Sequence, residues 1–276
     1  MGIHTSTYNY FTNQSEITNV RPAEGDNRVK SVVSGTDLYE QLDKYYADVA
    51  REALLGAPQD DSTLIHYIVP CFSRYSTGAH SVHRLLNYVN RHVVRQAMDE
   101  DRGWLRLKDV LECVAKTITA DDTREKVSNR MKEKRIDELK KWGYVDGGST
   151  ELMAQAEGCA EAASTPDRII SLSSLAFRRF RTEFFEPLLA VPKVKGKSKA
   201  KNRKPPPSNG DKLGPKGRLA RAVKELLESK GGDEEERRKL VGDLAVALKT
   251  CGIRADHPLR KRLDKFIALR EGQGTD

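Results

Sequence analysis

The stretch LLNYVNRHVVRQAMDEDRG, residues 85–103, combines recurring valines and leucines with many Arg, His, Asn and acidic residues. At 100° per residue on a helix, its side chains and those just before it divide into two stripes. The apolar stripe is predicted to face a core and holds Val82, Leu86, Val89, Val93 and Ala97. The opposite stripe is predicted to face solvent and holds Arg84, Tyr88, Arg91 and Arg95. Tyr and Arg are enriched at binding hot spots, but periodicity alone favours a solvated basic face with an incidental Tyr.

Helical spacing recurs along the rest of the chain and predicts an all-α fold, because no useful length of sequence alternates as a strand does. A helix is expected over 38–55 with Asp37 as its N-cap, and Pro70 is expected to kink the next one, over 62–75. Further helices are expected over 79–99, from 103 to about 118, over 121–142, up to 159, over 168–187, and at 219–228, 234–249 and 259–270.

Charge divides the chain into two parts. Residues 1–192 hold 25 basic and 28 acidic side chains, whereas residues 193–276 hold 23 basic and 12 acidic ones. Residues 193–204 carry seven basic side chains and no acidic one, and a run of three prolines follows, a composition typical of a disordered linker. We therefore expect a helical domain over 1–192, a linker over 193–216 and a small helical tail over 217–276. The tail could form its own hairpin or dock onto the body.

Chemistry-bearing motifs are sparse. His80 and His83 have a spacing that could hold a metal, but no matching ligand lies nearby, so they are expected to face solvent. The adjacent acids Asp99, Glu100 and Asp101 do not converge on one point and are expected to be solvated in a loop. The four cysteines are scattered without a C-x-x-C pair. The sequence thus predicts a protein that is not an enzyme, with no metal and no cofactor.

Location is predicted from what the sequence lacks. No apolar run approaches the ~20 residues that cross a bilayer, and the first residues lack the pattern of a secretory signal. We expect no membrane partner, and a cytoplasmic or nuclear protein.

Three segments in order resemble the N-terminal domain of cullins, the scaffolds of multisubunit ubiquitin ligases. YVNRHVVRQAMDEDRG, residues 88–103, resembles the cullin signature Y-L-N-R-H-W-V-[RK]-R-…-D-E-G. TYNYFT, residues 7–12, resembles V-Y-N-Y-C-T, and GTDLYEQLDKYY, residues 35–46, resembles G-x-E-L-Y-x-x-L-x-x-Y/F. The similarity is to the cullin of the SCF (Skp–cullin–F-box) class, over about residues 5–110. It is faint to about 190, where SLSSLAFRRFRTEFFEPL resembles a helix of the second repeat, and absent beyond.

The resemblance implies a stack of five-helix repeats, with the first repeat at about 1–115 and a partial second at about 116–192. In cullins the second and fifth helices of the first repeat bind the adaptor. Carried over by position, the second helix would supply His4, Tyr8, Asn9 and Tyr10, and the fifth would supply Tyr88, Arg91 and Arg95, with Arg84 on the same exposed stripe. The implied partner is a Skp-type adaptor and, through it, F-box proteins.

The chain also departs from the family. It begins where the second cullin helix is already under way, so we expect either that the first helix is missing or that the start codon is mispredicted, and Val93 stands where cullins usually have Trp. Nothing in 193–276 resembles the half that recruits the RING-box subunit, so that subunit is not expected as a partner. The resemblance therefore implies a truncated ligase component, a decoy or a regulator in ubiquitin-dependent protein catabolism.

The alternative is a nucleic-acid- or ribosome-associated protein. Residues 193–224 carry 12 basic side chains and one acidic one. A solubilising linker or a nuclear-import signal is the plainer interpretation of this segment.

Overall fold

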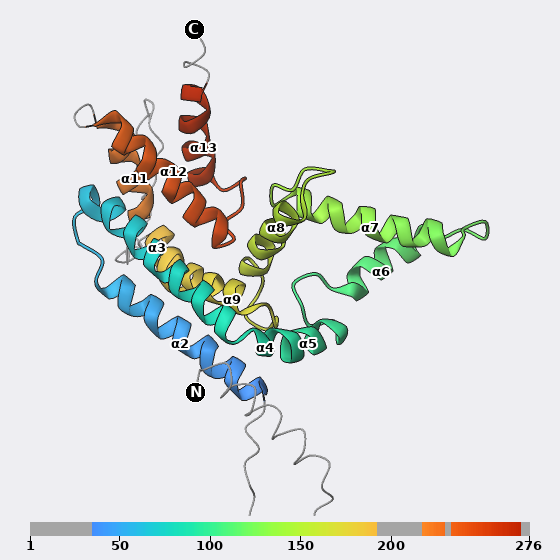
Figure 1. The fold of residues 1–276 in the computed structure, drawn as a ribbon. Helices are drawn as coiled ribbons and strands as arrows, with labels where there is room; N and C mark the ends of the chain where they lie inside the picture. The colour runs from blue at the N-terminus through green and yellow to red at the C-terminus, as the bar shows by residue number, and fades with distance from the viewer. Residues whose placement is uncertain (1–34, 192–216, 230–232, 272–276) are drawn as a thin grey trace, which may run out of the picture.

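The computed structural model describes residues 35–191, 217–229 and 233–271, and every regular element in these ranges is a helix (Figure 1). The all-α prediction is therefore confirmed for this part of the chain. The segment around residues 7–12 and the basic linker 193–216 lie outside it. No helix in the described ranges is long and apolar enough to span a bilayer.

Three long segments build the centre of the body. Helix α9 (Leu172–Phe180) packs against both α2 (Gly35–Leu55) and α3 (Asp61–Leu85). Phe180 is fully buried between them, with its ring centroid 5.4 Å from that of Phe72 on α3. On the rim, the Arg179 guanidinium forms a two-pronged ion pair with the Asp43 carboxylate, which ties α9 to α2. The apolar contacts around Phe180 and the bidentate Arg179–Asp43 ion pair at their edge together fix the arrangement of α2, α3 and α9.

Helix α3 corrects one sequence expectation, because it runs unbroken for 25 residues where two helices were predicted. Pro70 lies inside it, and the ring is exposed. The hydrogen bond that Pro70 cannot make is lost on the solvent side, while Ile65, Ile68 and Phe72 hold the opposite face against the core. A smaller correction concerns α2, which begins at Gly35, so Asp37 lies in its first turn instead of capping it.

The stretch from Leu85 to Gly103 is not the continuous helix that was predicted. The backbone leaves helical geometry at Leu86, and then α4 (Asn87–Val89), the π-helix η1 (Asn90–Val94) and α5 (Arg95–Asp99) follow. A π-turn accommodates one extra residue and shifts the side chains after it. As a result Val94 is buried, whereas Val93 from the predicted apolar stripe is half-buried.

The π-turn also places Asn90 where a polar side chain is needed. Its Oδ1 accepts a hydrogen bond from the backbone amide of Leu172 at 3.0 Å, at the first residue of α9. Its Nδ2 lies 3.1 Å from Nδ1 of His83 on α3. Asn90 therefore joins three helices through one side chain and satisfies an amide that the start of a helix leaves unpaired.

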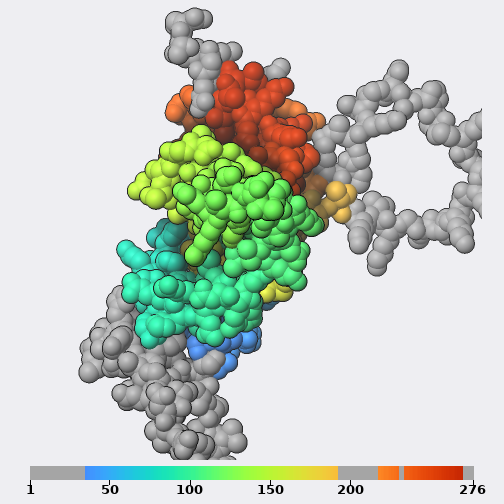
Figure 2. Space-filling view, turned by 90° about the vertical axis from the view of Figure 1, so that its right-hand side faces the viewer, coloured from blue at the N-terminus to red at the C-terminus, as the bar shows by residue number. Residues whose placement is uncertain are grey.

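Helices α6 (Leu107–Ala115) and α7 (Arg124–Lys140) form a hairpin that projects from the body, and α8 (Thr150–Ala162) leads back to it (Figure 1). We call this hairpin the arm. Figure 2 faces the arm, with α4 and α5 on one side of it and the C-terminal helices on the other. A small second core of Leu139, Tyr144 and Ala156 joins α7 to α8. Trp104 packs against both this core and the main one.

The chain then continues through α9, the π-helix η2 (Arg181–Phe185) and α10 (Glu186–Leu189). The last helices are α11 (Arg218–Glu228), α12 (Glu234–Thr250) and α13 (Pro258–Glu271), and they match the positions expected from the sequence. Both α11 and α12 pack on α3, and α12 also contacts α8. Of the two arrangements considered for the tail, the structure thus has the docked one, within a single main core.

Ion pairs and close backbone contacts hold the C-terminal helices against the body. The Asp61 carboxylate on α3 pairs with Arg218 at 3.3 Å and with Arg221 at 2.8 Å. Gly217 lies so close to α10 that a Cβ there would stand 2.3 Å from the carbonyl oxygen of Leu189. Gly252, with φ +77°, approaches the end of α8, where a Cβ would stand 2.4 Å from the amide nitrogen of Ala163. Both positions therefore require glycine.

Candidate functional site

We call Arg84, Tyr88, Arg91 and Arg95 the Tyr–Arg face. The structure places them on the end of α3, on α4, on η1 and on α5, and the three arginine side chains are exposed. None of the three guanidinium groups forms a hydrogen bond or ion pair with any residue of the described ranges. Tyr88 is half-buried and packs against the main core, with its ring centroid 4.0 Å from that of His92.

The second half of the predicted adaptor surface, His4, Tyr8, Asn9 and Tyr10, lies outside the described residues. The structure therefore does not bring the two halves together or separate them.

The two candidate metal-binding histidines differ in environment. His80 is exposed and its ring lies against Phe177, with centroids 5.6 Å apart. His83 is half-buried instead of solvent-facing, and burial, reinforced by the charge of His80, lowers its pKa. Within the described ranges no group of three or more His, Cys, Asp or Glu side chains is arranged to hold a metal ion. His83 contributes to the link with Asn90 described above.

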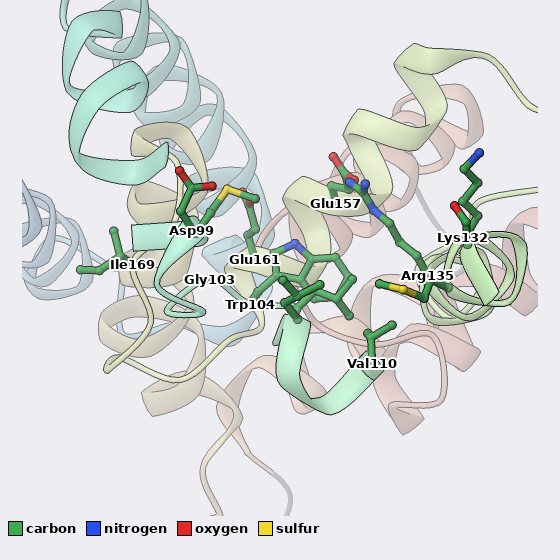
Figure 3. Close-up of a pocket in the computed structure, with 14 residues that line it drawn as sticks. Asp99, Gly103, Trp104, Val110, Lys132, Arg135, Glu157, Glu161 and Ile169 are labelled. Carbon is green, nitrogen blue, oxygen red and sulfur yellow. The ribbon is translucent and has the colours of Figure 1, made fainter. Parts of the chain in front are cut away.

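A cavity of about 430 Å³ separates the arm from the body (Figure 3). The end of α5 and the loop after it form one wall, α6 and α7 form the second, and α8 forms the third. Its apolar lining consists of Met98, Trp104, Leu105, Leu107, Val110, Met131 and Ile169. This volume lies within the range of sites that enclose small organic ligands.

Glu161 supplies a carboxylate to this apolar space. The hydroxyl groups of Ser171 and Ser174 donate hydrogen bonds to its Oε2, at 2.9 and 2.5 Å. No described residue donates to Oε1. Burial raises the pKa of this carboxyl, and the two serine hydroxyls only partly oppose the rise. Glu161 is therefore a half-satisfied acid on a cavity wall.

The remaining charges are unevenly distributed around the cavity. Glu157, one helical turn before Glu161, forms an ion pair with Arg135 of α7. Asp99 has no ion-pair partner in the described ranges and lies with Glu161 on one side of Trp104 (Figure 3). Lys132 lies on the other side, beyond Arg135, and its ammonium group points away from Trp104 (Figure 3). The charged side chains that line the Trp104–Glu161 end of the cavity are therefore acidic.

Sequence reasoning did not find this cavity. It treated Asp99 as one of three solvated acids, and it gave Glu157 and Glu161 no role. The available signal was their spacing of four residues in an alanine-rich helix, which puts both carboxylates on one face. What the sequence could not indicate is that the loop at Trp104 and the arm would close around that face.

Of the basic segment 193–224, only its last residues are described. Arg218 and Arg221 pair with Asp61, and Lys224 pairs with Glu228 at 3.6 Å. In this portion the basic charge is therefore matched by carboxylates of the same chain.

Comparisons of the chain with protein-family models, with curated proteins and with solved structures find no match.

Proposed function

We propose that this chain is a cullin-like scaffold module that binds a Skp-type adaptor and, through it, an F-box protein. The observation that carries the proposal is the Tyr–Arg face, with three exposed guanidinium groups that have no partner in the described ranges. Other arginines of the body are used internally: Arg51 and Arg179, for example, each pair with carboxylates of neighbouring helices. Arginine and tyrosine side chains are both enriched at protein-binding surfaces.

The resemblance in sequence gives this face its partner. Tyr88, Arg91 and Arg95 fall in YVNRHVVRQAMDEDRG, residues 88–103, which resembles the signature with which cullins hold their adaptor, and Arg84 lies four residues before it. The module is proposed to act by occupying the adaptor, and this binding makes and breaks no covalent bond. Nothing in residues 193–276 resembles the half of a cullin that recruits the RING-box subunit, so these residues are not proposed to connect a bound adaptor complex to the ubiquitin-transfer machinery. The proposed role is that of a decoy, a regulator or a partial ligase component.

Arg91→Ala tests the surface most directly, because Arg91 is exposed and its removal leaves the core unchanged. We expect it to weaken binding of a purified Skp-type adaptor–F-box complex by about 2 kcal/mol, or roughly 30-fold, measured by calorimetry. Tyr88→Ala should weaken adaptor binding by the same amount. Because Tyr88 also packs on the core, the thermal stability of this variant must be measured in parallel.

The matched control is Arg238→Ala, an exposed arginine on α12 that lies away from the Tyr–Arg face. It removes the same charge and should leave adaptor binding within twofold of the wild-type value. Equal binding by the Arg91→Ala variant and the wild type would show that the assigned surface is wrong. A pull-down should recover the adaptor without the RING-box subunit.

A further inference from the structure

We infer that the cavity between the arm and the body binds a small organic ammonium ion, with its charged group at Glu161 and its apolar portion beside Trp104. This inference does not depend on adaptor binding, because none of the residues of the Tyr–Arg face lines the cavity.

The shape and lining of the cavity set the size and polarity of the ligand. Half of the side chains around it are apolar, and Trp104 contributes an indole ring to its middle (Figure 3). Two methionines, Met98 of α5 and Met131 of α7, line different walls, and their unbranched side chains adapt to irregular ligands. An apolar body is therefore favoured over a sugar or a phosphate ester.

The charge of the ligand follows from Glu161. Its Oε2 is occupied by two serine hydroxyls, which hold the carboxyl in one orientation, while Oε1 has no donor in the described ranges. A carboxylate oxygen in an apolar cavity is costly unless it receives a hydrogen bond or a charge. An ammonium group supplies both.

The neighbours of Glu161 favour a cation over an anion. Asp99 lies on the same side of Trp104 and adds a second negative charge, whereas Arg135 is neutralised by Glu157 and Lys132 points away (Figure 3). The indole of Trp104 also attracts a cation through its ring face. An anionic ligand at this end would meet the carboxylates of Glu161 and Asp99. The charge of Arg178 also acts on Glu161, but Arg178 is buried outside the cavity lining, and its guanidinium donates hydrogen bonds to the hydroxyl of Ser164 and to the carbonyl oxygens of Thr165 and Arg168.

The probe for the test is 2-phenylethylammonium, which combines one aromatic ring with one ammonium group. Its neutral counterpart, 2-phenylethanol, has nearly the same shape. We expect the ammonium to bind the full chain at pH 7.5 at least tenfold more tightly than the alcohol, by calorimetry. The chain has two tryptophans, so NMR can locate the site: the indole signal of Trp104 should shift on titration, and Trp142→Phe identifies which signal that is.

Glu161→Gln tests the acid itself, since glutamine keeps the shape and the acceptor for the serines. Ammonium binding should weaken at least tenfold. The matched control is Glu133→Gln, an exposed acid of α7 that does not line the cavity, and it should leave the affinity within twofold. Failure of wild type to bind the ammonium saturably, equal affinity for the alcohol, or unchanged affinity in a folded Glu161→Gln variant would each overturn the inference. If Glu161→Gln does not fold, the comparison of ammonium with alcohol on wild type decides.

Discussion

At the scale of single residues, the carboxyl of Glu161 links stability to pH. Burial raises its pKa in the folded chain, with Glu157 adding to the rise and Ser174, Ser171 and Arg178 opposing it. The folded state therefore binds a proton more tightly than the unfolded state. The stability that Glu161 contributes is then fully present below its unfolded pKa of about 4.3 and is lost as pH rises through the folded value.

Glu161→Gln removes this titration and should alter the pH profile in a defined direction. Near pH 4 the variant and the wild type should have similar free energies of unfolding. As pH rises to 8, the variant should become progressively more stable relative to the wild type, because glutamine never ionises. Urea unfolding at several pH values measures the difference. A gap between the two curves that stays constant from pH 4 to 8 would contradict the environment assigned to Glu161.

Gly147 and Gly252 have similar φ angles but different surroundings. Substituting each by alanine therefore distinguishes the cost of backbone strain from the cost of a clash with a neighbouring element. Gly147 has φ +76° and open space around it, whereas Gly252 has φ +77° and lies against the backbone of Ala162 and Ala163. Gly147→Ala should cost about 1–2 kcal/mol, the usual penalty for a side chain in left-handed geometry. Gly252→Ala should cost more than this, because the end of α8 must also move. Chemical denaturation of both variants measures this, and equal costs would show that the contact at α8 contributes nothing.

At the scale of elements, the arm depends on one polar clamp at its tip. The Asp122 carboxylate accepts hydrogen bonds from the Arg130 guanidinium and from the backbone amide of Thr119, each at 2.8 Å. These contacts, that of Arg130 first, lower the pKa of Asp122 to about 2. Since the folded pKa is lowered, the stabilisation is present above the unfolded value and is lost as pH falls toward about 2.

Asp122→Asn should therefore loosen the arm while leaving the body intact. At pH 7 we expect faster amide hydrogen exchange in α6 and the first turns of α7, with unchanged exchange in α3. The control is Asp121→Asn at the neighbouring exposed acid, which should change neither. Faster exchange throughout the molecule would mean that the arm and the body unfold as one unit.

Comparing the predicted helices with the observed ones shows which features of the fold can be predicted from sequence patterns. Apolar spacing predicted the all-α class and the positions of α7, α8, α11, α12 and α13. It divided α3 after Tyr75 and expected a kink at Pro70, because local rules cannot include the core contacts of Ile65, Ile68 and Phe72, which hold the helix together. It also missed the π-turn at 90–94, since the extra residue is fixed by what Asn90 contacts on α9, far away in sequence. Predictions therefore failed where tertiary contacts decided the geometry.

At the scale of the whole molecule, the C-terminal helices complete the body's core. Leu219, Val223, Leu244 and Leu248 are fully buried in the same core as α2, α3 and α9. An amphipathic helix in a sequence shows that it has an apolar face but not which surface covers it. For this reason the sequence allows the C-terminal helices either to form a separate hairpin or to dock onto the body, and it does not distinguish between the two.

Removing residues 217–276 should therefore expose core instead of leaving an independent domain. We expect the fragment 1–216 to bind a hydrophobic dye, to aggregate during size-exclusion chromatography and to lose a cooperative thermal transition. A milder variant, Asp61→Asn, removes the ion pairs to Arg218 and Arg221 and should lower the melting temperature without aggregation. A monomeric fragment with the melting curve of the full chain would show that the tail is dispensable.

The pairing of Asp61 with Arg218 spans 157 positions and has a consequence for biosynthesis. Helix α3 leaves the ribosome long before the helices that cover it. At ordinary translation rates of ~5–20 residues per second, the delay is roughly 8 to 30 s. During that interval the apolar face of α3 that later receives α11 and α12 is open to other nascent chains. The protein is therefore expected to engage a chaperone on the ribosome, and slowing translation between α3 and α11 should prolong that engagement.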